Sequence, residues 1–173
     1  KRAILYSVSS VSLAARVLGK ADKAREYLAQ ELEKQGFSVE VYRLNPFKYL
    51  TPKGINGKKV LADIPVLEFR KKYDVVFVIA DVQSFSTTNE RNLHWSIPMG
   101  PEIPWYAAEK TTVFISVANP FHLYDVPMVP VCINTYNGSR EAIRQAVEKI
   151  TGKSEFKGNS PVDAFCGMWD TRL

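Results

Sequence analysis

The stretch of the chain that most limits its fold is Lys110–Tyr136, in which two apolar, β-branched runs stand close together. The runs are Thr112–Val117 and Val129–Ile133, and neither alternates polar with apolar residues. A strand that is apolar on both sides must be covered on both sides, as in a parallel sheet flanked by helices. The segment between the runs has room for one helical turn, with Asn119 as N-cap and Pro120 as first helical residue. We therefore predict two neighbouring buried strands joined by a short crossover.

Other segments predict three further strands and two long helices. Ala3–Val8 and Tyr73–Ala80 are apolar throughout, whereas Ser38–Tyr42 alternates, which places it near an edge of the sheet. Asp22–Gln35 and Ser139–Thr151 carry apolar residues at three- and four-residue steps, so each predicts a helix with one buried side.

The remaining segments are less regular. Pro104–Glu109 and the segment from Leu13 to Gly19 each predict a short helix, and Leu61–Phe69 is compatible with either a strand or a helix. Lys153–Leu173 has no period and predicts an extended tail over the domain. The aromatic and apolar residues that could anchor this tail are Phe156, Phe165, Met168 and Trp169.

Alternation of strands with helices predicts an α/β fold: a three-layer sandwich with a mostly parallel open sheet of about five or six strands and helices on both faces. We expect residues 1–173 to form a single α/β domain that ends in the tail 153–173. Ligands of such sheets bind outside the carboxyl ends of the strands. Those ends are predicted at Ser9-Ser10, Arg43-Leu44, Asp81, Ala118-Asn119 and Tyr136-Asn137.

Composition narrows the classes of partner. The net charge is +5, but the basic clusters Lys58-Lys59 and Arg70–Lys72 are not interleaved with aromatic residues, so we predict solvated loops and no nucleic-acid partner. No apolar run approaches the ~20 residues that span a bilayer, so no membrane span is expected. A chain that begins at Lys1 rather than Met is expected to be processed or to be part of a longer protein.

The sequence holds few motifs with known chemistry. It contains no GxGxxG, P-loop or GxSxG motif and no metal-ligand spacing of His and Cys, so we expect no cofactor and no metal. Cys132 is expected to be a buried free thiol, although a bridge to Cys166 is also compatible with the sequence. His122 is predicted to be a hydrogen-bonded structural histidine, whereas His94 could be structural or functional.

Two segments resemble a known family. Pro98–Pro127 and Ser154–Leu173 are similar to the C-terminal α/β domain of glycoside hydrolase family 3, especially to two-domain bacterial β-N-acetylhexosaminidases. In that family a glycine-rich segment before a Ser-Pro or Leu-Pro pair closes this domain, and FKGNSPV at Phe156–Val162 has this form. The resemblance is looser over Lys1–Asp81.

The resemblance implies an accessory role in cleaving a carbohydrate substrate. Family members carry the nucleophilic aspartate on an N-terminal (β/α)₈ barrel of ~250 residues, for which this chain has no room. We therefore expect no catalytic residue here, an N-terminal barrel as partner, and no activity of the chain alone. The candidates for lining the sugar cleft or the interface with the barrel are Asp81, Arg91, His94 and Trp95. In one branch of the family a glutamate of this domain serves as acid/base; no residue here matches a family motif closely enough to carry that role over, and Glu90 and Asp81 stay open for it.

Two other functions are compatible with the sequence. A free-standing flavodoxin-like module would bind a small ligand at the carboxyl ends of the strands, using the loop after the first strand. A complete small hydrolase would use Asp81 together with His94, although no nucleophile motif supports it.

Overall fold

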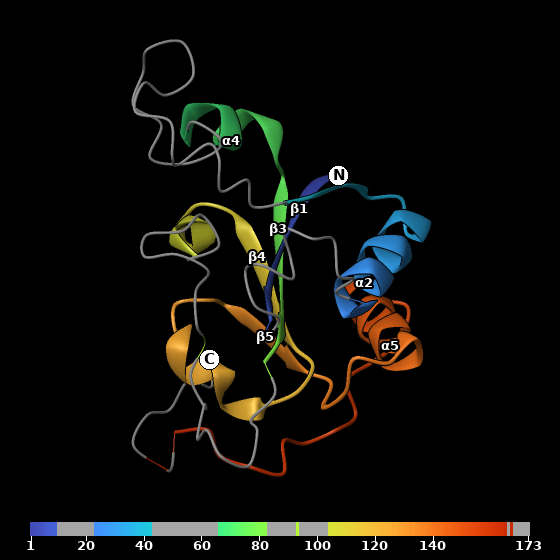
Figure 1. Cartoon of the computed structure of the whole chain (residues 1–173), viewed down its shortest axis with the longest axis vertical. Helices are drawn as coiled ribbons and strands as arrows, with labels where there is room; N and C mark the ends of the chain where they lie inside the picture. Colours follow the sequence, from blue (N-terminus) through green and yellow to red (C-terminus); the bar gives the residue numbers. More distant parts are fainter. Residues whose placement is uncertain (10–22, 43–65, 83–92, 94–103, 166, 168–173) are drawn as a thin grey trace.

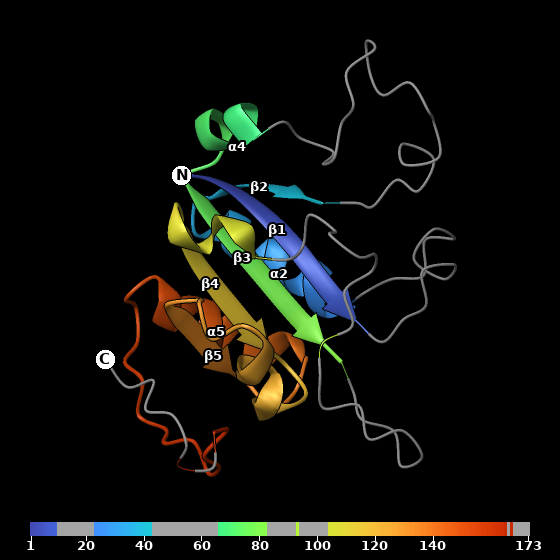
Figure 2. The same cartoon turned by 90° about the vertical axis from the view of Figure 1, so that its left-hand side faces the viewer.

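The computed structural model describes residues 1–9, 23–42, 66–82, 93, 104–165 and 167. Its centre is one five-stranded sheet of order β2-β1-β3-β4-β5, in which every neighbouring pair is parallel. The strands are β1 (Arg2–Ser9), β2 (Ser38–Val41), β3 (Val75–Asp81), β4 (Thr111–Ser116) and β5 (Val131–Asn134). All five predicted strands are therefore present, and the alternating one, β2, lies at an edge as expected (Figure 2).

Helices cover both faces of the sheet, as Figure 1 shows with the sheet seen edge-on. α2 (Lys23–Lys34) and α5 (Arg140–Ile150) pack on one face. α4 (Val66–Lys72) and two short 3₁₀ helices, η1 (Trp105–Ala108) and η2 (Pro120–Asp125), lie on the other face. The predicted three-layer α/β sandwich is confirmed.

The position of β3 in the centre of the sheet explains why polar and apolar residues do not alternate along its sequence. Val75, Phe77 and Ile79 belong to the core under α2 and α5, whereas Val76 and Val78 belong to the core on the opposite face. Both sets are almost completely buried. A strand between two hydrophobic layers needs apolar side chains at every position, which is the pattern that the sequence carries.

Local hydrogen bonds place the helix ends where the sequence predicts them. The Ser139 hydroxyl accepts a hydrogen bond from the Ala142 N–H at the start of α5. The Asn119 side chain accepts one from the Phe121 N–H at 2.9 Å, with Pro120 as the first residue of η2. Gly138 precedes α5 where a Cβ atom would lie only 3.2 Å from the Cβ atom of Ala24, so a residue without a side chain allows α5 to begin beside α2.

Two expectations about burial are corrected. The second apolar run was expected to be buried on both faces, but β5 is the edge strand and Val131 is 41% exposed. Phe156 does not anchor the tail, because it is 60% exposed. Phe165 does anchor it, since it is buried and stacks on Tyr124 with ring centroids 5.5 Å apart.

The structure also shows the secondary structure of two less regular segments. The described part of Leu61–Phe69, the stretch with an open assignment, is the start of helix α4, which runs from Val66 to Lys72. The short helix expected in Pro104–Glu109 is η1. The helix expected between Leu13 and Gly19, and the tail residues Met168 and Trp169, lie outside the described residues.

Candidate functional site

The connections of the sheet place Asp81 where doubly wound sheets bind ligands. Ser9 ends β1, Asp81 ends β3, and the two are aligned in the register of these neighbouring strands. From β1 the chain continues to α2 on one face, and from β3 it continues to η1 on the other. Such a reversal opens a crevice at the carboxyl ends of the two strands. Asp81 is partly exposed at this point.

A buried histidine holds the end of the next strand, β4. The Ser116 hydroxyl donates to the Asn119 carbonyl at 2.6 Å, and Nδ1 of His122 lies 2.8 Å from the same hydroxyl oxygen. Because the single hydroxyl proton goes to Asn119, Nδ1 of His122 carries the proton of this second hydrogen bond. The predicted structural, hydrogen-bonded role of His122 is confirmed.

The protonation state of His122 follows from its burial. Its side chain is fully enclosed, and burial lowers the pKa of His122 to about 4, against the opposing effects of Asp125 and the Val82 backbone. The imidazole is therefore neutral at pH 7 and has no access to solvent. It is a structural group and not a proton donor to a substrate.

Asp125 joins η2 to the segment that follows β3. Its carboxylate accepts a hydrogen bond from the Leu93 N–H at 2.7 Å, and Leu93 is buried. In the sequence Leu93 stands between Arg91 and His94. Nothing in the sequence indicated this contact, because Asp125 and Leu93 belong to no common motif and are 32 residues apart.

The structure describes only one of the four predicted cleft residues. Asp81 lies at the crevice described above, whereas Arg91, His94 and Trp95 lie outside the described residues, as does Glu90. Within the described part of the chain, no group of three or more His, Cys, Asp or Glu side chains could hold a metal ion. In the same part, no helix has the length and apolar character needed to span a bilayer.

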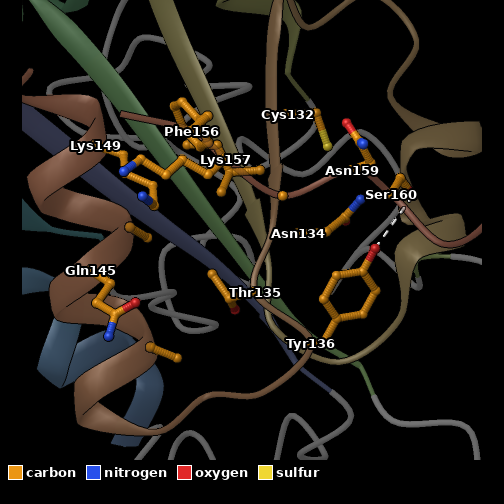
Figure 3. A pocket seen from close by; sticks show the side chains of 14 residues that line it. Cys132, Asn134, Thr135, Tyr136, Gln145, Lys149, Phe156, Lys157, Asn159 and Ser160 are labelled. Carbon is orange, nitrogen blue, oxygen red and sulfur yellow. Dashed lines mark hydrogen bonds between the residues drawn. The ribbon is translucent and has the colours of Figure 1, made fainter. Parts of the chain in front are cut away.

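A pocket of about 420 Å³ lies between the edge strand β5, the helix α5 and the tail (Figure 3). Tyr136 borders it with a φ of 60°, in the left-handed region that bulky residues rarely adopt. Its hydroxyl lies 3.3 Å from the Ser160 hydroxyl of the tail. Tyr136 had been predicted at the carboxyl end of a strand, which was the only signal for this pocket in the sequence.

Cys132 lines the same pocket as a free, half-buried thiol. Cys166, the other partner of the bridge that the sequence left open, lies outside the described residues. Burial raises the pKa of Cys132 to about 12, so the group stays a neutral thiol.

Comparisons with known proteins point to one family. No family model matches the chain. A curated β-N-acetylglucosaminidase/β-glucosidase of Cellulomonas fimi is 40% identical over 109 residues, which are 63% of this chain. The solved structure of beta-glucoside phosphorylase BglX is 31% identical, with a TM-score of 0.74 over 99% of this chain. The same phosphorylase bound to 2FGlc is 32% identical over 97% of the chain, with a TM-score of 0.70.

These relatives and structural neighbours are glycoside hydrolase family 3 proteins, and the chain corresponds to a partial domain of them, consistent with their C-terminal α/β domain. The family 3 β-N-acetylglucosaminidase of Paenibacillus sp. str. FPU-7 shares the fold alone, with 14% identity and a TM-score of 0.56 over 94% of the chain. This family 3 domain spans 19% of the length of the Cellulomonas relative and 27% of each solved chain. The predicted resemblance is confirmed, and the domain is a minor part of the proteins that it matches.

Proposed function

We propose that this family 3 domain is the accessory domain of a retaining glycoside hydrolase that acts on β-N-acetylglucosaminides. Its loops at the carboxyl ends of the strands would complete a sugar cleft on an N-terminal (β/α)₈ barrel that carries the nucleophile. The observation that carries the proposal is the 40% identity to an enzyme named β-N-acetylglucosaminidase/β-glucosidase, of which the chain covers only 19%.

The chemistry of the described residues supports an accessory role. Retaining cleavage needs two carboxyl groups about 5–5.5 Å apart, one protonated and one ionised. Asp125 at this end of the sheet is bonded to the Leu93 backbone, and His122 is neutral and enclosed. The position of Asp81 at the carboxyl end of β3, paired with Ser9 of β1, supports a place for its carboxylate in such a cleft. We propose that Asp81, with Arg91, His94 and Trp95, borders the cleft or contacts the barrel.

The proposal is tested first on the chain alone with an aryl β-N-acetylglucosaminide. No turnover is expected, and addition of the barrel from the same protein should produce activity. Clear turnover by the chain alone would refute the accessory role. It would favour the small hydrolase, which the variants Asp81→Asn and His94→Gln would then test.

The role of Asp81 has a matched control in Asp74. Asp74 lies at the opposite end of β3, where it is exposed and bonded to Arg2. In the complex with the barrel, Asp81→Asn should lower kcat/KM, whereas Asp74→Asn should leave it unchanged. Equal effects of the two substitutions would mean that Asp81 has no part in the cleft.

A second candidate reaction is phosphorolysis. The two solved structures at 31–32% identity, which match 97–99% of this chain, are both of a β-glucoside phosphorylase. In phosphorolysis, phosphate replaces water as the acceptor of the glycosyl group, so the product is a sugar 1-phosphate. The complex with the barrel would be assayed with and without phosphate. Turnover that requires phosphate and yields a sugar phosphate would favour this reaction over hydrolysis.

The flavodoxin-like module is the third candidate. The loop that it requires after β1 falls within residues 10–22, which are outside the described residues. A flavin or nucleotide that copurifies with the chain would favour it over the accessory role.

A further inference from the structure

The pocket beside β5 has the dimensions and construction of a small-molecule site. Its volume of about 420 Å³ lies within the range of roughly 300–1,000 Å³ that is usual for ligand pockets. Its walls come from three separate parts of the chain: the edge strand β5 with the turn after it, the helix α5, and tail residues 156–160 (Figure 3). The tail is held over the pocket by the contact between Tyr136 and Ser160 and by a hydrogen bond from the Lys149 ammonium group to the Glu155 carbonyl.

Side-chain amides from all three walls line the pocket. They are Asn134 at the end of β5, Gln145 on α5, and Asn159 in the tail. An amide presents a donor and an acceptor together, which matches the donor and acceptor of each hydroxyl group on a sugar. Oδ1 of Asn134 is buried and has no hydrogen-bond partner among the described residues. A buried acceptor without a donor is costly, which favours a turn of the Asn134 side chain that brings its amide to a ligand hydroxyl in the pocket.

Two exposed aromatic side chains also line the pocket. Tyr136 is 44% exposed and Phe156 is 60% exposed, although large apolar groups usually lie inside a domain. The backbone of Tyr136 is strained at a φ of 60°, and its hydroxyl is tied to the tail. Strain of this kind persists where surrounding contacts fix a residue, often at a ligand site. Aromatic rings beside convergent amides can pack on the C–H faces of a pyranose while the amides bind its hydroxyl groups.

The charges of the lining indicate binding without hydrolysis. Among the described residues that line the pocket there is no carboxylate, so the acid and base of glycoside cleavage are absent from it. The charged groups are Lys149 and Lys157, of which Lys149 donates to the Glu155 carbonyl and lies 5.6 Å from the ring centroid of Phe156. The lining therefore has more neutral amide and hydroxyl groups than ammonium groups. This composition favours a neutral ligand rich in hydroxyl groups over an anion.

We propose that the pocket between β5, α5 and the tail binds one pyranose ring of a glycan. The ring packs on Tyr136 or Phe156, and its hydroxyl groups bond to the side-chain amides that line the pocket, with Asn134 turned toward the ligand. The inference rests on the proposed function in one respect, which is the choice of N-acetylglucosamine and glucose sugars as probes. The residues that line the pocket all belong to this chain, so binding is tested on the chain alone.

The experiment titrates the 173-residue chain with N-acetylglucosamine, N,N′-diacetylchitobiose and cellobiose, using calorimetry and amide chemical shifts. Saturable binding by at least one sugar is expected, with shifts at residues 132–136 and 156–160. Asn134→Ala and Phe156→Ala should each weaken that binding about tenfold, the size of one lost hydrogen bond or ring contact. The matched control is Leu67→Ala on α4, since Leu67 is 68% exposed and is not part of this pocket. This control should bind as the unchanged chain does.

Thermal unfolding separates a ligand role from a structural one. Because Oδ1 of Asn134 has no partner among the described residues, Asn134→Ala should keep the melting temperature while it weakens binding. Loss of both would show that Asn134 serves the fold, and Phe156→Ala, which removes an exposed ring, would then decide the proposal. The proposal is refuted if no probe sugar binds, if Phe156→Ala binds as well as Leu67→Ala does, or if inorganic phosphate alone binds with the same dependence on these residues. None of these results alters the activity assay with the barrel, so failure of the pocket and failure of the proposed function are distinguishable.

Discussion

The burial of His122 predicts how the stability of this domain depends on pH. The ring is enclosed and neutral in the folded state, with a pKa lowered to about 4, whereas a histidine in the unfolded chain has its ordinary pKa of about 6.5. Below the unfolded pKa, the unfolded chain binds a proton that the folded chain does not, so stability falls as the pH is lowered. The loss begins near pH 6.5 and stops near pH 4, where the folded state also accepts the proton.

The size of the effect follows from the shift between the two states. Each pKa unit corresponds to about 1.4 kcal/mol, so the full contribution of His122 is about 3 kcal/mol. Between roughly pH 7.5 and pH 5 the loss is about 2 kcal/mol, since part of the transition lies below pH 5. This is a large fraction of the 5–15 kcal/mol that is typical of a whole domain.

The assay is urea denaturation at several pH values of the chain and of His122→Gln, both in a His94→Gln background. The chain has two histidines, so in this background only the residue at position 122 differs between the two proteins. The free energy of unfolding of the histidine protein should fall by about 2 kcal/mol more than that of the glutamine protein between the two pH values. Parallel pH profiles would refute the reasoning, because they would mean that the folded state does not hold His122 neutral.

Substitutions at three further positions test the fold. Phe114→Ala removes a fully buried ring from the core opposite α2 and α5, and should lower the free energy of unfolding by about 3–5 kcal/mol in the same assay; a loss below about 1 kcal/mol would contradict this packing. Ser139→Ala removes the N-cap of α5 and should cost about 1 kcal/mol, with Ser139→Asp restoring most of it. Asp125→Ala removes the acceptor of the Leu93 N–H, so hydrogen exchange at Leu93 should accelerate while exchange in β3 stays slow; unchanged exchange at Leu93 would show that Asp125 does not hold this segment.

The sequence was sufficient to predict the elements of the sheet because burial on two faces has a clear pattern. β1, β3 and β4 are apolar at almost every position, and they occupy the middle of the sheet. The same argument failed for β5, since a short apolar run at an edge is as hydrophobic as one in the centre. Val131 is exposed because β5 is an edge strand, which among the described strands pairs only with β4. The position of a strand within the sheet is set by tertiary contacts, which the sequence of one strand does not show.

The candidate site was less predictable from the sequence. Asp81 was found because the carboxyl end of a buried strand is a position that the fold defines. The contact of Asp125 with Leu93 and the pocket around Asn134 join residues from elements that are distant along the chain. No spacing rule connects such residues, so these features become visible only when the strands and helices have been placed.

The direction of β1 sets a requirement for rebuilding a larger enzyme from this domain. Lys1 lies at the amino ends of the strands, where Figure 2 marks the N-terminus, whereas Asp81 lies at the carboxyl end of β3. The eight residues of β1 separate these two ends by roughly 26 Å at the usual rise of a strand. A catalytic module fused ahead of Lys1 would therefore join the domain at the end of the sheet opposite Asp81. Either a tether or the breadth of the module itself would have to span this distance before its residues could meet Asp81.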